Sequence, residues 1–163
     1  MGVKAMFLLY EALDGRDGHQ VGRALLAQAY RQATGEELPP IAVTPRGKPY
    51  FPDRKWHFSI SHTKHFAFCA LSRNNIGLDA EEKGRKVSTA LMDKYTSDAE
   101  KNRLGGDPQD AFLRLWVLKE AESKRTGRGM GNWLKDTDFH PDDPRIQEIN
   151  GCYVAVLEEN DAV

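Results

Sequence analysis

The sequence of 163 residues predicts an α+β fold. Three observations support this class. Residues 56–61 and 65–72 have the pattern of a β-hairpin, residues 110–125 form a helical stretch without Gly or Pro, and no repeat, linker or low-complexity segment divides the chain. Strands and helices in this order favour an antiparallel sheet packed with helices. With 40% apolar and 29% charged residues, the chain can build one sizeable core or two small packed lobes.

The N-terminal third predicts a strand, a helix and an extended segment. Residues 5–12 (AMFLLYEA) are mostly apolar, as in a buried strand, and residues 14–18 (DGRDG) have turn composition. Residues 19–33 carry apolar side chains at helical spacing, and Gly35 follows as the stop of that helix. Residues 39–53 contain five of the eight prolines, so we expect them to be extended or turning.

The middle of the chain predicts three strands. Trp56, Phe58 and Ile60 alternate with polar residues, which is typical of a half-buried strand, and residues 65–72 form its hairpin partner. An Asn-Asn turn then leads into a third strand at 76–80.

The C-terminal half predicts a buried helix and a final strand. Residues 83–109 are polar, with a short helix near 88–95. The helix at 110–125 begins with an almost continuously apolar half, which predicts burial, and the glycines of residues 126–131 end it. Residues 152–159 read as the last strand.

Charge and cysteine content narrow the function classes. A net charge of −1 argues against a general nucleic-acid binder, whose affinity comes from clustered Lys and Arg. Cys69 and Cys152 each lie in an apolar run without a CxxC pair, which predicts buried, reduced thiols. The apolar run near the N-terminus is too short for a signal peptide or a membrane span. We therefore expect a soluble cytoplasmic protein that acts on neither nucleic acid nor membrane.

Residues 76–82 (IGLDAEE) run an apolar strand into carboxylates. Side chains alternate along a strand, so Asp79 and Glu81 project on one side and apolar residues on the other. Two such carboxylates repel each other unless a cation lies between them, and Mg²⁺ binds carboxylates, water and substrate phosphates. The alternative is a strand end that has simply reached water.

The helix at 113–125 adds a third carboxylate. Glu120 and Lys124 lie one turn apart on one face, so both could point into one cleft, one toward a metal and one toward phosphate oxygens. The alternative is an ordinary surface ion pair. Upstream, Ser61 and His62 at a strand end offer groups for binding an anion, although a lone His is more often structural. Lys48 lies in a Pro-Gly loop that could line a nucleotide, although such loops are also common on protein surfaces.

Read together, four segments resemble the Sfp-type 4'-phosphopantetheinyl transferases. They are GKPYF, FSISH, IGLDAEE and WVLKEAESK, in the family's order, and the resemblance covers roughly residues 45–130. Residues Trp116, Lys119, Glu120, Ala121 and Lys124 match the family's WxxKEAxxK segment. Ala80 stands where the family usually has a branched aliphatic residue, and the first forty residues match only loosely.

The resemblance implies an activity. Such enzymes transfer the 4'-phosphopantetheine arm of coenzyme A to a serine of an apo acyl or peptidyl carrier protein, with Mg²⁺ or Mn²⁺ as cofactor, and release 3',5'-bisphosphoadenosine. The carriers serve fatty-acid, polyketide or nonribosomal peptide synthesis. Two alternatives stay open: a catalytically silent module that binds coenzyme A, and a Mg²⁺-dependent nucleotide phosphohydrolase.

The resemblance also implies roles for single residues. Asp79, Glu81 and Glu120 would hold the metal, with Glu120 as the catalytic base. Lys124 would act at the pyrophosphate. The remaining residues implied to bind coenzyme A are Ser61 and His62 at its phosphates, Lys48 along the adenosine, and Arg16 and Arg23 at the 3'-phosphate.

The family's fold is likewise implied. We expect a single phosphopantetheinyl transferase domain over 1–163, built of two similar lobes at about 1–74 and 75–163, with the N-terminal lobe shortened. The presence of both the SISH and WxxKEAxxK segments favours a monomer over the trimers of the single-lobe AcpS type.

Overall fold

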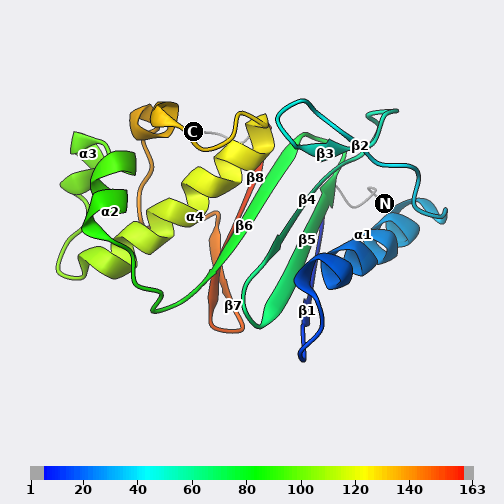
Figure 1. Ribbon diagram of the computed structural model, residues 1–163, viewed down its shortest axis with the longest axis horizontal. Helices are drawn as coiled ribbons and strands as arrows, with labels where there is room; N and C mark the ends of the chain where they lie inside the picture. Colours follow the sequence, from blue (N-terminus) through cyan, green and yellow to red (C-terminus); the bar gives the residue numbers. More distant parts are fainter. Residues whose placement is uncertain (1–5, 160–163) are drawn as a thin grey trace.

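Two three-stranded sheets form the centre of the computed structural model, which describes residues 6–159 (Figure 1). The first sheet has the order β1-β5-β4. Its strands are β1 (Met6–Ala12), β4 (His57–His62) and β5 (Phe66–Ser72), and both pairings are antiparallel. Residue 5 of the expected first strand lies outside the described residues, and the hairpin of β4 and β5 is confirmed.

The second sheet repeats this strand order as β6-β8-β7. Its strands are β6 (Ile76–Glu82), β7 (Ile146–Ile149) and β8 (Cys152–Glu158), again antiparallel. In both sheets the strand that comes last along the chain lies in the centre. The predicted α+β class is thus confirmed, whereas a division into two lobes near residue 74 stays a prediction.

Two long helices cover the sheets. Helix α1 (Gly18–Thr34) packs on β5, β1 and β4, and α4 (Pro108–Thr126) packs on β6 and β8. Gly35 and Gly127 end these helices in the left-handed conformation, with φ of 74° and 72°. No helix within 6–159 combines the length and apolar character that a membrane crossing needs.

Shorter elements connect the main ones. A two-strand ribbon of β2 (Ala42–Val43) and β3 (Pro49–Tyr50) lies in the proline-rich segment, as its extended character predicted. Helices α2 (Thr89–Tyr95) and α3 (Asp98–Lys101) and the 3-10 helix η1 (Asn132–Asp136) lie beside α4.

The side chains of β5 show how the layers pack. Ala67, Cys69 and Leu71 enter the core beneath α1, whereas Phe68 and Ala70 enter a core shared with β6 and β8. Helix α1 thus covers the first sheet and α4 covers the second, β4 and β6 lie side by side between the two helices, and the opposite faces of the sheets share a core (Figure 1). The predicted burial of the first half of α4 is confirmed, because its apolar residues fill the core against β8.

Strand β6 and helix α4 approach closely at Gly77. A Cβ atom at this position would overlap the backbone oxygen of Ala121 and lie 2.5 Å from the backbone nitrogen of Arg125. Backbone atoms in the middle of a helix cannot move aside, so only glycine fits here.

We therefore expect Gly77→Ala to lower the free energy of unfolding by about 3 kcal/mol through overpacking. Urea unfolding followed by circular dichroism measures the loss. Gly106→Ala is the matched control, because a Cβ there would meet no atom within 4 Å. Equal stability of the two variants would contradict the close contact of β6 and α4.

Candidate active site

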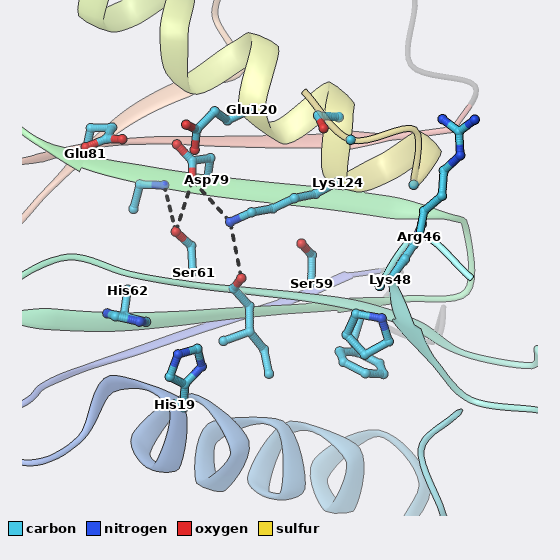
Figure 2. A pocket seen from close by; sticks show the side chains of 18 of the residues that line it. His19, Arg46, Lys48, Ser59, Ser61, His62, Asp79, Glu81, Glu120 and Lys124 are labelled. Atoms are coloured by element: carbon cyan, nitrogen blue, oxygen red, sulfur yellow. Dashed lines mark hydrogen bonds and ion pairs between the residues drawn. The ribbon is translucent and has the colours of Figure 1, made fainter. Parts of the chain in front are cut away.

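A cavity of about 630 Å³ lies between α1 and α4, along the neighbouring strands β4 and β6 (Figure 2). Its lining combines carboxylates at one end with basic groups and hydroxyls along the rest. It is lined by residues of α1, the segment at 46–49, β4, β6 and α4, and of the segments that follow β6 and α4.

Three carboxylates meet in this cavity. One oxygen from each of Asp79, Glu81 and Glu120 lies within 4.8 Å of the others. Asp79 and Glu81 project from the same face of β6, as the alternation predicted, and α4 crosses that face so that Glu120 points toward them (Figure 2). Sequence positions 41 residues apart are thereby joined into one acidic cluster.

Only one oxygen of the Asp79 carboxylate accepts hydrogen bonds from N–H and hydroxyl groups of the described residues. It is 3% exposed, and its Oδ1 accepts hydrogen bonds from Ser61 Oγ and Lys124 Nζ, both at 3.2 Å. Its Oδ2 is buried and has no N–H or hydroxyl donor among the described residues. A buried acceptor without a donor is uncommon, and it leaves one oxygen available to a cation.

The cluster raises the pKa values of its other two members. Burial, followed by the negative charge of Asp79 and a hydrogen bond to it, raises the pKa of Glu120 to about 9. Burial and the charge of Asp79 also raise the pKa of Glu81, although Arg85 Nη1 lies 2.5 Å from its Oε1. Without a cation, burial and the neighbouring charge of Asp79 therefore disfavour the ionised form of Glu120.

These residues fit a divalent cation. Mg²⁺ and Mn²⁺ prefer oxygen ligands, and the cluster offers three carboxylates with one uncommitted oxygen on Asp79. A cation would also relieve the repulsion that raises the pKa values of Glu81 and Glu120.

Basic side chains follow the strands away from the acidic cluster. Lys124 Nζ donates to the carbonyl of Ile60 at 3.3 Å as well as to Asp79. At the other side of β4, the rings of His62 and His19 meet edge to face with centroids 4.9 Å apart, and Arg23 lines the same wall. His19 is a site residue that the sequence reasoning missed. The sequence feature that could have pointed to His19 is its position in the first turn of α1, beside the N-cap residue Asp17.

Lys48 lines the cavity with its aliphatic stem, but its ammonium is bound at the end of α4. Lys48 Nζ donates to Asn75 Oδ1 at 2.7 Å and to the carbonyl of Arg125 at 2.5 Å. The latter carbonyl belongs to the last turn of the helix, where a cation is favoured. Burial and then the positive charge of Arg125 lower the pKa of Lys48 from 10.5 to about 8.

We expect the amine of Lys48 to titrate near pH 8, measured by NMR on ¹³C-methylated lysines with Lys48→Met for assignment. In the unfolded chain its pKa stays near 10.5, so between about pH 8 and 10.5 the unfolded state binds more protons. The stability of the wild type relative to Lys48→Met should therefore rise with pH across this interval. A midpoint near 10.5 in the folded protein would contradict the buried setting.

Arg16 lies apart from the cavity. Its guanidinium donates to the carbonyls of Ala12 and Leu13 and pairs with Glu11, and it is not among the lining residues. The structure therefore brings together eight of the nine residues considered from the sequence. Seven of them line the cavity beside Lys48: Arg23, Ser61, His62, Asp79, Glu81, Glu120 and Lys124.

The neighbour of Glu120 on α4 has a separate environment. Lys119 is fully buried, and its Nζ pairs with the fully buried Glu100 at 2.8 Å. The ammonium also donates to the carbonyl of Leu134 and to Thr137 Oγ1, at 2.7 and 2.8 Å. This ion pair joins α3 and η1 to α4 behind the cavity, so Lys119 supports the helix that carries Glu120.

Fold and cavity together define a class of protein: an α+β protein with an acidic cluster that could hold a divalent cation beside basic groups suited to phosphates. Residues 75–157 match the sequence profile of the 4'-phosphopantetheinyl transferase superfamily. The chain belongs to this superfamily.

Individual relatives agree with this assignment. The chain is 34% identical over 123 residues to the 4'-phosphopantetheinyl transferase Sfp of Bacillus subtilis (strain 168), which covers 69% of this chain and 54% of that protein. It is 32% identical over 88 residues to the 4'-phosphopantetheinyl transferase gsp of Aneurinibacillus migulanus, covering 52% of this chain and 36% of that protein. The chain thus spans about half the length of the Bacillus relative.

Proposed function

We propose that this protein transfers the 4'-phosphopantetheine arm of coenzyme A to a serine of an apo acyl or peptidyl carrier protein. One observation supports this most strongly: the carboxylates of Asp79, Glu81 and Glu120 share a single cavity with Lys124 and His62. Carboxylates suit a divalent cation, and the basic groups suit the phosphates of coenzyme A.

The proposed reaction is a displacement at phosphorus. The serine oxygen forms a bond to the phosphorus nearer the pantetheine, and the bond from this phosphorus to the bridging oxygen breaks. The electron pair leaves with 3',5'-bisphosphoadenosine, and the serine proton passes to the carboxylate of Glu120. A bound Mg²⁺ or Mn²⁺, held by Asp79, Glu81 and Glu120, would neutralise charge on the pyrophosphate.

The other cavity residues bind and orient the substrate. The ammonium of Lys124 lies between Asp79 and the backbone of Ile60, where it can contact the pyrophosphate. His62 and Arg23, from the first sheet and α1, offer donors to the 3'-phosphate. The stem of Lys48 borders the space proposed for the adenosine. We propose that the chain does this as a monomer in the cytoplasm.

The test is incubation of the full chain with coenzyme A, Mg²⁺ and a panel of apo carrier proteins, read by mass spectrometry. A mass increase of one phosphopantetheine arm on the carrier serine is the expected result. Binding of coenzyme A without any mass change on the panel would favour a silent binding module. Release of adenine nucleotide without a carrier would favour a phosphohydrolase.

A further inference from the structure

Strands β4 and β6 lie side by side at the floor of the cavity but belong to different sheets. Serine hydroxyls bridge them. Ser59 Oγ accepts a hydrogen bond from the backbone N–H of Leu78 at 3.0 Å, and Ser61 Oγ accepts one from the backbone N–H of Ala80 at 3.2 Å. These hydroxyls satisfy two N–H groups that strand carbonyls would satisfy in a continuous sheet.

The two serines are alike in burial but differ in one bond. They are 7% and 6% exposed, and each accepts from one N–H group of β6. Ser61 alone also donates a hydrogen bond to Asp79 Oδ1, so its single hydroxyl proton is directed at that carboxylate (Figure 2). Together with Lys124, it occupies Oδ1 and leaves Oδ2 on the side of Glu120.

We propose that Ser61 is a positioning residue for Asp79, whose hydroxyl fixes the carboxylate so that Oδ2 is free to bind the divalent cation. This inference rests on the proposed function, and it differs from the phosphate contact that the family resemblance implies for Ser61. Groups that orient metal ligands typically change metal affinity about 10–100-fold when they are removed.

The first experiment measures binding of Mn²⁺ alone by isothermal titration calorimetry. Ser61→Ala should weaken binding about 10-fold, whereas Ser59→Ala should change it less than about twofold. The two variants are matched, because each leaves one N–H of β6 without its serine acceptor. Similar melting temperatures with different Mn²⁺ affinities would separate the positioning role from a structural one, and Ser61→Thr, which keeps the hydroxyl, should restore binding.

The second experiment measures binding of coenzyme A in EDTA. Ser61→Ala should bind as tightly as wild type, within about twofold, because its hydroxyl is directed at Asp79. A loss of affinity confined to coenzyme A would overturn the proposal and assign Ser61 to a phosphate. Equal Mn²⁺ affinity of Ser61→Ala and Ser59→Ala would also overturn it, although the transferase proposal would stand. Wild type that binds Mn²⁺ and coenzyme A without modifying any carrier would contradict the transferase proposal alone.

Discussion

Glu120→Gln is expected to lower the rate of carrier modification by about 1,000-fold, with the fold intact. The amide keeps the size of the side chain but can neither accept the serine proton nor bring a negative charge to the acidic cluster. Glu120 lies at the cavity surface and is only partly buried, so the exchange disturbs little packing. Initial rates of arm transfer, followed by mass spectrometry at saturating coenzyme A, measure the effect.

A neighbouring acid on the same helix gives the control. Glu122 pairs with Arg125 and does not line the cavity, so Glu122→Gln should keep the rate within about twofold. Circular dichroism and melting curves of both variants would confirm that they fold alike. Activity of Glu120→Gln within tenfold of wild type would refute its assignment as base and ligand.

Lys119→Met is expected to lower the free energy of unfolding by about 3–5 kcal/mol, because it leaves Glu100 buried without its partner charge. Both side chains have no exposed surface. The carboxylate of Glu100 also accepts hydrogen bonds from the backbone N–H groups of Ser97 and Phe139, which fixes it in place. Urea unfolding of the single variant measures the loss.

The double variant Lys119→Met/Glu100→Gln separates charge from packing. Glutamine keeps an acceptor for one of the two backbone N–H groups and removes the buried charge, so most of the lost stability should return. Losses that simply add in the double variant would show that the two side chains do not act as a pair. Lys119 supports α4 from behind the cavity. Its replacement should therefore lower the free energy of unfolding while the same residues still line the cavity.

Alternation and helical spacing carried most of the sequence interpretation. They placed Asp79 and Glu81 on one face of a strand and Glu120 and Lys124 on one face of a helix, and the structure brings all four together. These patterns depend only on residues close together in the sequence, so they can be recognised without any knowledge of the packing. Strand β7 escaped detection because its four residues place two polar residues between two isoleucines, which is not a period-two pattern.

Interaction partners that are distant in the sequence could not be predicted from local patterns. The sequence showed that Lys119 was unusual in an apolar helix, but nothing singled out Glu100 within a long polar stretch as its partner. Lys48 was expected along a nucleotide, yet its ammonium is bound at the end of α4, a contact that depends on how the 45–51 loop folds back. Such long-range pairings follow from the tertiary arrangement of the elements.

The central position of β8 has a consequence for the order in which the protein matures during synthesis. β6, which carries Asp79 and Glu81, forms its ladder with β8, and this strand is made more than seventy residues later. The first sheet, by contrast, has all three of its strands once residue 72 has emerged. His62 therefore lies on a sheet whose strands have all been synthesised at a stage when β8, the strand that supports the acidic cluster, has not. A nascent chain can therefore form one wall of the cavity early, and the complete cavity arises only as a late event.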